Sequence, residues 1–293
     1  MRRYSPTAIH KYEACPRQYR YHYIDRVRSS VMSSNLVFGH AIHTATTGYL
    51  AGTVTNLEDA FRTAFFQESA ESEIEYTSRL GPDDLEATGV ELCRQFPDAW
   101  RDSGLMVAHD MHGAIVERRM TTPLGDGIEL ISQLDVLAMT MDADFQLIDI
   151  KSPASDSPDG WQGDQLTAYQ VGCEHHAETL GIPSIQGVGF MNLLKRKVSK
   201  NRSAKGPEAM APKIEPARSQ QEVDEYVQKI HWIDEDIQRG RFPKRSLMAH
   251  DTPCMLCEFR GLCQNGDWTG LEIKPRRAEQ SEAAGTEAQA LPA

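Results

Sequence analysis

Two extended apolar stretches lie near the middle of the chain and are separated by a short polar segment. They cover 128–139 and 145–151, are rich in Ile, Leu, Val and Phe, and flank the turn-like residues 141–144. This pattern predicts two β-strands joined as a hairpin. Apolar runs at 114–120 and 186–194 predict two further strands.

Helical patterns fill most of the remaining chain. The stretch 165–180 predicts a helix that ends at Gly181 and Pro183, and 219–240 predicts an amphipathic helix that ends at Gly240. The acidic stretch 55–112 has apolar residues at helical spacing and predicts a helical insert. The resulting β-β-β-α-β order indicates an α/β fold with a helix lying on a mixed sheet.

Three of the charged residues in the predicted hairpin are expected to lie close together. Asp149 and Lys151 share one face of their strand because side chains alternate, and Asp135 is expected on the same face of the neighbouring strand. Buried charges must be paired or must hold a metal. Two carboxylates with the Ile150 carbonyl and water suit Mg²⁺ or Mn²⁺. A plain ion pair on an exposed strand is the alternative for Asp149 and Lys151 taken alone.

Three cysteines gather near the end of the chain. Cys254, Cys257 and Cys263 lie in the sequence CMLCEFRGLC, and three thiolates so close together repel one another unless they share a metal. Zinc and a [4Fe–4S] cluster both accept four thiolates, so the spacing does not choose between them. Cys93 and Cys173 fall on helical patterns and are expected to be structural.

The overall charge limits how the chain can contact nucleic acid. Its net charge of −11 over 293 residues excludes a uniformly basic surface, so any DNA path must be a local positive strip. The basic stretch 195–205 and the Arg- and Tyr-rich stretch 1–28 are the candidates, with merely solvated charges as the alternative. The candidate DNA contacts are Lys195, Arg196, Lys197, Lys200, Arg202, Trp161, Arg17 and Arg20. No apolar run predicts a membrane span or a signal peptide, which favours a cytoplasmic protein.

The order of these motifs resembles the PD-(D/E)XK nuclease superfamily, and within it the RecB-like branch. The residues that carry the resemblance are Gly39 and His43, Asp135, Asp149-Ile150-Lys151, and Gln165 with Tyr169. A single cysteine before the core, Cys15, and three after it resemble the iron–sulfur subset of this branch. That subset includes the AddB nuclease domain and the CRISPR-associated adaptation exonuclease family.

The resemblance implies a restriction-endonuclease-like core and a role for each matched residue. His43, Asp135, Asp149 and the Ile150 carbonyl would hold Mg²⁺ or Mn²⁺, and Lys151 would stabilise charge on the attacked phosphate. Gln165 and Tyr169 would position DNA or the lysine. A [4Fe–4S] cluster would be held by Cys15, Cys254, Cys257 and Cys263, with structural Zn²⁺ as the alternative. Glu117, in the first predicted strand, is a candidate for a second metal or a hydrogen-bond network.

The implied activity is metal-dependent hydrolysis of DNA, most simply by a single-strand exonuclease in DNA repair and recombination, phage replication or CRISPR adaptation. The alternative is a non-catalytic iron–sulfur DNA-binding subunit of a larger helicase–nuclease or integrase complex. The sequence has no Walker A motif, so a helicase, recombinase or integrase partner would be a separate polypeptide.

These patterns predict five regions along the chain. They are a basic N-terminal segment with the first cluster cysteine and the G-x-x-x-H motif (1–50), an acidic helical insert (51–112), the nuclease core (113–218), a C-terminal helix with the iron–sulfur cysteines (219–270), and a disordered tail (271–293).

Overall fold

The chain is organised as two compact units in the computed structural model, which describes residues 1–71, 73–156, 163–199, 205–250 and 252–275. We call residues 1–7 and 31–232 the sheet unit, and residues 8–30 and 233–293 the cysteine unit. The division therefore joins segments from both ends of the sequence in one unit. The five predicted regions stay a prediction.

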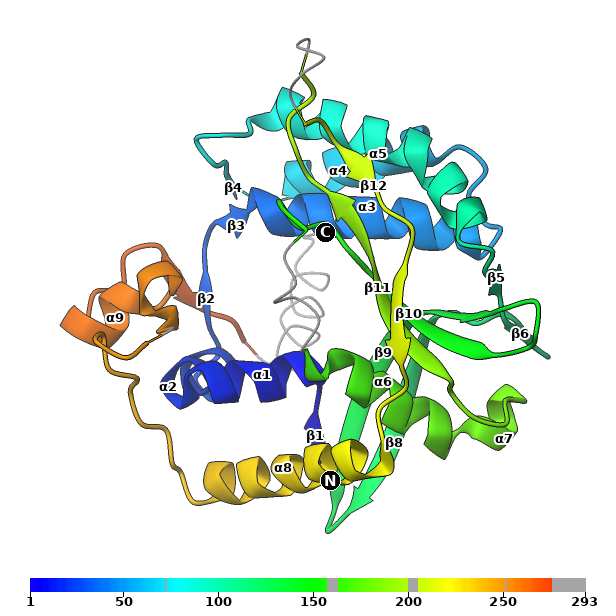
Figure 1. Ribbon diagram of the computed structural model, residues 1–293. Helices are drawn as coiled ribbons and strands as arrows, with labels where there is room; N and C mark the ends of the chain where they lie inside the picture. The colour runs from blue at the N-terminus through cyan, green and yellow to red at the C-terminus, as the bar shows by residue number, and fades with distance from the viewer. Residues whose placement is uncertain (72, 157–162, 200–204, 251, 276–293) are drawn as a thin grey trace, which may run out of the picture. The chain divides into compact units, whose positions relative to one another are not determined.

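A mixed β-sheet forms the centre of the sheet unit (Figure 1). Its main strands are β8 (Val116–Gly125), β9 (Ile128–Met139), β10 (Phe145–Lys151) and β11 (Gly187–Leu194). Neighbours β8–β9 and β9–β10 are antiparallel, and β10–β11 is parallel. The predicted strand order and the mixed character of the sheet are confirmed.

Shorter strands extend this sheet or pair separately within the same unit. Strand β1 (Arg2–Tyr4) runs parallel to β9, β5 (Met106–Val107) pairs with β9, and both β12 (Glu208–Ala209) and β13 (Lys213–Pro216) pair with β11. Two small pairs lie outside the main sheet, β3 (Met32–Ser33) with β4 (Ile74–Glu75) and β6 (His109–Asp110) with β7 (Gly113–Ala114).

Two tight turns set the register of the three antiparallel strands. The β9–β10 turn closes with hydrogen bonds between Thr140 and Asp144 and between Ala143 and Thr140, and Ala143 has a positive φ of 63°. The first predicted strand, expected to end at 120, runs on to Gly125 because Asp126 and Gly127, with φ of 49° and 74°, turn it directly into β9. The register of both hairpins is thus fixed by residues that accept left-handed backbone.

Helices cover both faces of the sheet (Figure 1). One face packs against α3 (Ser34–Leu50), α4 (Leu57–Glu71) and α5 (Pro82–Asp102), and its sheet residues include Val136, Ile148 and Ile150. The other face packs against α6 (Asp164–His175) and α7 (Ala177–Leu180) through Leu137, Leu147 and Val188. Alternate residues of β9 and β10 therefore pack into two separate apolar cores, one on each face of the sheet.

Local contacts and dihedral angles set the ends of two helical segments. Helix α3 begins at Ser34 because the Ser33 hydroxyl accepts a hydrogen bond from the Asn35 amide and caps the helix. The helix predicted over 165–180 is broken at His176, whose φ of −100° and ψ of 14° separate α6 from α7. Gly181 then ends α7 in the left-handed conformation, as the sequence indicates.

The cysteine unit is built from short elements near the two ends of the described chain. They are α1 (Pro6–Ala14), α2 (Pro16–Tyr19), a π-helical turn (Arg20–Ile24), β2 (Val27–Ser29), the end of α8 (Gln220–Gln238), a 3₁₀ turn (Pro253–Leu256), α9 (Arg260–Asn265) and β14 (Leu271–Ile273). Strands β2 and β14 pair antiparallel and join residues more than 240 positions apart. Within the described residues, we find no helix with the length and apolar character needed to cross a membrane.

Candidate active site and cysteine centre

The strand register brings the two predicted aspartates together. Ile148 pairs with Val136 across β9 and β10, so the next step of the ladder places Asp149 opposite Asp135. Both carboxylates are buried, Asp149 completely. The Ile150 amide, directly after Asp149 on β10, donates a hydrogen bond to Asp135 Oδ2 at 2.8 Å. Two carboxylates so close in a buried place require compensating positive charge.

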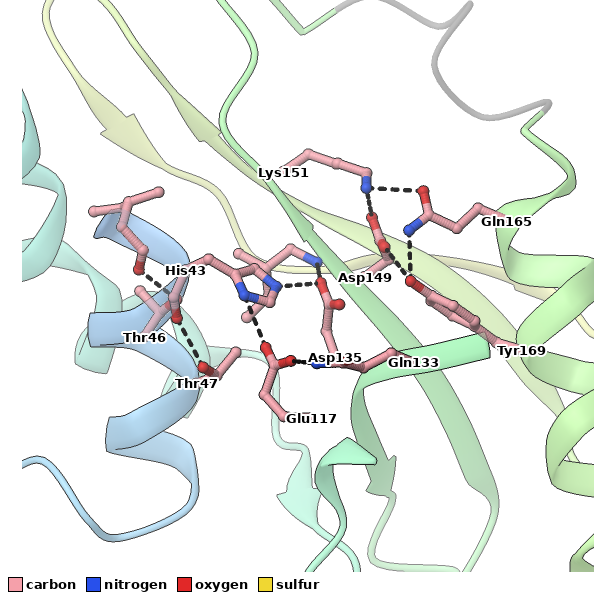
Figure 2. Close-up of polar contacts among 12 residues, drawn as sticks. His43, Thr46, Thr47, Glu117, Gln133, Asp135, Asp149, Lys151, Gln165 and Tyr169 are labelled. Atoms are coloured by element: carbon pink, nitrogen blue, oxygen red, sulfur yellow. Dashed lines mark hydrogen bonds and ion pairs between the residues drawn. The ribbon is translucent and has the colours of Figure 1, made fainter. Parts of the chain in front are cut away.

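Three hydrogen bonds and one ion pair form a closed ring at Asp149, and we call it the Lys151 network (Figure 2). The Lys151 ammonium lies 2.8 Å from Asp149 Oδ2 and donates to Gln165 Oε1 at 2.9 Å. The Gln165 amide donates to the Tyr169 hydroxyl, which donates to Asp149 Oδ1 at 3.3 Å. Gln165 and Tyr169 stand one turn apart on α6, so the helix presents both to the end of β10.

Burial and the neighbouring charges set the protonation of this network. Burial and the nearby Asp135 charge raise the pKa of Asp149, and the Lys151 ammonium acts in the opposite direction. Burial and the two aspartates also raise the pKa of Tyr169, so its phenol keeps its proton and remains a donor. The ring therefore holds Lys151 in one position with 42% of its side chain exposed.

A second set of contacts, the His43 network, lies beside Asp135 (Figure 2). The His43 Nε2 atom lies 2.8 Å from Asp135 Oδ2, and its Nδ1 atom lies 2.8 Å from Glu117 Oε1. The Gln133 amide donates to Glu117 Oε2. Burial lowers the pKa of His43, but the bonds to both carboxylates outweigh burial and raise that pKa to about 10. In this arrangement the imidazole is a cation shared by two acids.

Glu117 reaches His43 from an unusual backbone conformation. Its φ is 51° inside strand β8, between the paired residues Val116 and Arg118. A residue with a Cβ pays strain energy in this left-handed region, and such strain is typical of functional sites. From the sequence, Glu117 is a candidate for a second metal or a hydrogen-bond network, but no local signal predicts a positive φ for glutamate.

The donor set fits a divalent cation. Within the described residues, ligand atoms of His43, Glu117 and Asp135 all lie within 4.8 Å of one another. Two buried oxygens, Glu117 Oε1 and Asp149 Oδ2, have ion-pair partners but no hydrogen bond of normal geometry. Carboxylate oxygens with one imidazole nitrogen suit Mn²⁺ or Mg²⁺. Asp149 adjoins this group and is oriented by Lys151 and Tyr169.

Helix α3 places His43 at this point. Its apolar residues Ile42 and Ala45 pack into the core, and the Thr47 hydroxyl donates to the His43 carbonyl at 2.8 Å. Gly39, one turn earlier, faces Ser152, the residue directly after Lys151. A Cβ added at Gly39 would lie 3.8 Å from Ser152 Oγ, an ordinary contact, so this close approach alone does not require glycine.

Comparison with known families agrees with this geometry. Residues 3–264 match the model of the PD-(D/E)XK nuclease superfamily. The chain belongs to this superfamily. A solved structure described as "Crystal structure of SSO0001" is similar at 11% identity and a TM-score of 0.35, covering 90% of this chain and 87% of that one. A search of curated proteins finds no match.

The basic stretch after β11 was expected to contact DNA, but its first residue is buried. Lys195 is buried, donates to Asn35 Oδ1 at 2.5 Å and lies 5.2 Å from the centre of the Phe38 ring. The expectation that its ammonium meets a phosphate is therefore corrected, because α3 covers it. Lys197 is exposed and pairs with Asp84 at 2.9 Å.

The other candidate DNA contacts also have protein partners where the structure describes them. Arg196 pairs with Glu208 at 3.0 Å. In the cysteine unit, Arg20 pairs with Asp25 at 3.2 Å, and Arg17 donates to the Phe242 carbonyl at 2.9 Å. The candidates Trp161, Lys200 and Arg202 lie outside the described residues.

The four predicted cluster cysteines line one small cavity in the cysteine unit. Cys15 is the residue between α1 and α2, Cys254 lies in the 3₁₀ turn, Cys257 directly follows that turn, and Cys263 lies in α9. All four are free thiols. Burial raises the pKa of the Cys257 thiol, and the nearby thiols of Cys15 and Cys254 raise it further. Because each thiol disfavours the ionisation of its neighbours, a cation that binds all of them would stabilise their thiolate forms.

This donor set fits a four-thiolate centre without identifying the metal. A small cavity of about 20 Å³ lies among these side chains. Tetrahedral zinc separates its sulfurs by about 3.8 Å. Within the described residues, no three cysteine sulfurs lie within 4.8 Å of one another, so zinc requires the thiols to approach.

The two remaining cysteines are separate from this centre. Cys93 on α5 and Cys173 on α6 are buried in the two apolar cores of the sheet unit. Burial raises the pKa of each thiol to about 12. Both are therefore unreactive, structural side chains.

Proposed function

We propose that this member of the PD-(D/E)XK superfamily is a divalent-metal-dependent deoxyribonuclease of the RecB-like kind. The observation that carries the proposal is the position of the Lys151 ammonium, fixed between Asp149 and Gln165 beside a group of ligands that fits a cation. An ion pair with no catalytic task would not need a fully buried carboxylate and a ring of hydrogen bonds around it.

The metal ligands in this proposal are His43, Asp135, Asp149 and the Ile150 carbonyl, joined by Glu117. A bound Mg²⁺ or Mn²⁺ supplies Lewis-acid stabilisation of the phosphate and lowers the pKa of coordinated water. Asp135 is central because its Oδ2 atom already contacts His43 and the Ile150 amide. For His43 to act as a ligand, its imidazole must lose the proton that it shares with the two acids.

Lys151 acts as the residue that stabilises charge on the phosphate. Its ammonium is partly exposed, so it can approach a phosphodiester while Asp149 and Gln165 hold its position. A cation already fixed at the place where negative charge develops requires little reorganisation during the reaction. Gln165 and Tyr169 are positioning residues for the lysine and for Asp149.

The cysteines supply a second, structural centre in the proposal. Cys15, Cys254, Cys257 and Cys263 hold a [4Fe–4S] cluster, with structural Zn²⁺ as the alternative. The resemblance of the cysteine spacing to iron–sulfur nucleases supports the cluster. Such a centre joins positions 15 and 263 of the chain, and closing a long loop gives the largest gain in stability.

The substrate in this proposal is DNA with free ends, single-stranded by preference, in repair, recombination, phage replication or CRISPR adaptation. This part rests on the resemblance to RecB-like exonucleases. A helicase, recombinase or integrase would act with the chain as a separate partner.

A cleavage assay tests the activity and its type. Anaerobically purified protein is given end-labelled linear DNA and circular single-stranded DNA, each with Mg²⁺, Mn²⁺ or EDTA. The proposal predicts metal-dependent shortening of linear strands and intact circles. Cut circles would show an endonuclease instead. DNA binding without cleavage of either substrate would favour the non-catalytic subunit.

A further inference from the structure

The cysteine centre is bordered by a segment without helix or strand, residues 241–245, that lies between α8 and the C-terminal cysteines. Its sequence is RFPKR. Although it has no regular structure, its backbone carbonyls and its side chains make hydrogen bonds to both cysteine-bearing parts of the unit. An irregular segment keeps one conformation only where such contacts hold it.

The first group of bonds runs from the N-terminal helices to this segment. The Tyr12 hydroxyl donates to the Arg241 carbonyl at 2.7 Å, and Arg17 Nε donates to the Phe242 carbonyl at 2.9 Å. The Phe242 ring is stacked on Tyr19, with centroids 6.3 Å apart and planes 7° from parallel. Tyr12 and Tyr19 flank Cys15 in sequence, on α1 and α2.

The second group runs from the segment to the backbone beside two cysteines. Arg245 donates to the carbonyls of Ala14 at 2.9 Å and Glu13 at 3.0 Å, directly before Cys15. Its neighbour Lys244 donates to the carbonyl of Cys263 itself at 2.5 Å. Two consecutive side chains thus bond to chain segments almost 250 residues apart. Bonds from charged donors are the stronger kind.

We propose that Lys244 and Arg245 are positioning residues for the four-cysteine centre, and that they fix the backbone of Cys15 and Cys263 before any metal is bound. The inference rests on the proposed metal centre at these cysteines. None of the bonds involves a thiol, so the framework does not depend on the metal. A metal site whose ligands are already held in place loses its metal more slowly, because a released thiolate stays beside it.

Arg245 and Arg260 offer a matched pair for the test. Both line the cysteine cavity, so each contributes one guanidinium to its surroundings. Arg245 bonds to the backbone before Cys15, whereas no hydrogen bond of the Arg260 side chain is found within the described residues. Arg245→Ala removes a cation and the bonds, and Arg260→Ala removes a cation alone.

The experiment measures metal release from the full chain. Wild type, Arg245→Ala, Arg245→Lys and Arg260→Ala are purified anaerobically, iron and zinc per chain are determined, and a chelator is added while visible absorbance and free metal are followed. We expect Arg245→Ala to release metal about 10-fold faster than wild type, as for other residues that orient metal ligands. Arg245→Lys, which can keep one bond, should be intermediate, and Arg260→Ala should match wild type. Far-UV circular dichroism should be unchanged in all four.

Three results would overturn the inference in distinguishable ways. Equal release from Arg245→Ala and wild type would show that the bonds do not hold the centre. Equally fast release from Arg245→Ala and Arg260→Ala would show an effect of charge alone. Wild-type protein without iron or zinc would refute the proposed cysteine centre itself, together with this inference, and would leave the nuclease proposal to its own assay.

Discussion

His43 in the sheet unit and His22 in the cysteine unit are similarly buried, with 29% and 22% of their side chains exposed. At neutral pH, however, His43 is a cation and His22 is neutral. His43 lies between two carboxylates that raise its pKa to about 10. Burial and the cations of Lys11 and Arg28 lower the pKa of His22 to about 4. Burial lowers the pKa of both rings, so the two carboxylates beside His43 make the difference between them.

The sites of the two units also differ in how the chain assembles them. In the sheet unit, the ligands come from adjacent strands and a packed helix, and the register of β9 and β10 sets their spacing. In the cysteine unit, hydrogen bonds link residues 241–245 to the segments that carry Cys15 and Cys263. In the proposed function, the first arrangement would gather acids for a hard cation, and the second would gather thiols for a soft one.

The largest expected effect is that of Asp135→Asn, which should change the site in the sheet unit and leave the cysteine unit unchanged. Asp135→Asn removes the charged oxygen that His43 and the Ile150 amide share, so Mn²⁺ binding and DNA cleavage should fall by about 100-fold or more. Metal bound at the cysteines should stay at the wild-type level. Calorimetric Mn²⁺ titration, cleavage and metal analysis check this, with Asp126→Asn in the exposed β8–β9 turn as the control. Loss of the cysteine-bound metal as well would contradict the separation.

Two substitutions of Glu117 should weaken metal binding equally but should differ in their effect on stability. Glu117→Ala and Glu117→Gly both remove a ligand, and each should weaken Mn²⁺ binding by about 10-fold. Because φ at this position is 51°, the glycine variant should be more stable to urea than the alanine variant by about 1 kcal/mol. Equal stability of the two variants would mean that the backbone at Glu117 is not strained.

Tyr169→Phe should affect the rate of cleavage more than metal binding. It removes the donor to Asp149 and the acceptor for Gln165, so it opens the Lys151 network without removing a proposed ligand. A loss of about 10-fold in the single-turnover rate is expected, since a bond to a charged group is lost. Tyr49→Phe on α3 is the matched control and should match wild type. A large loss of Mn²⁺ affinity in Tyr169→Phe would place the tyrosine in the metal site instead.

The smallest effect concerns His22 and pH. Its folded pKa is about 4, below its unfolded value, so the unfolded chain binds more protons between about pH 6.5 and 4, and stability falls as pH falls through this window. The same ring in neutral form accepts a contact from Lys11 at 3.4 Å. Urea unfolding at pH 7 and pH 5 should show a smaller loss of stability in His22→Gln than in wild type. An identical pH dependence in the two proteins would refute this assignment.

The sequence predicts the centre of the fold well and its margins less well. Strand alternation is local, so Asp149 and Lys151 could be placed on one face, and the polar turn between the strands was enough to align Asp135 with them. Cys254, Cys257 and Cys263 are close because they are close in sequence, but Cys15 entered only through the family resemblance. The roles of these residues stay predictions.

What the sequence could not show depends on contacts between distant segments. Lys195 belongs to a basic stretch, and only the packing of α3 over it makes it a buried cation. The positive φ of Glu117 and the bonds of Arg245 to carbonyls before Cys15 have no local sequence signal. Every residue has a backbone carbonyl. The sequence therefore cannot show which carbonyl a side chain binds, because no particular residue type marks the acceptor.

The central claim is that Lys151 stabilises charge during metal-dependent DNA cleavage at this site. The most direct measurement compares single-turnover cleavage of end-labelled DNA by wild type, Lys151→Ala and Arg101→Ala in saturating Mn²⁺. Arg101 is an exposed cation on α5, and its ion pair among the described residues is with Asp98, three positions earlier. We predict at least about a 100-fold slower rate for Lys151→Ala, with Mn²⁺ still bound, and a wild-type rate for Arg101→Ala. Cleavage by Lys151→Ala at the wild-type rate would contradict the account.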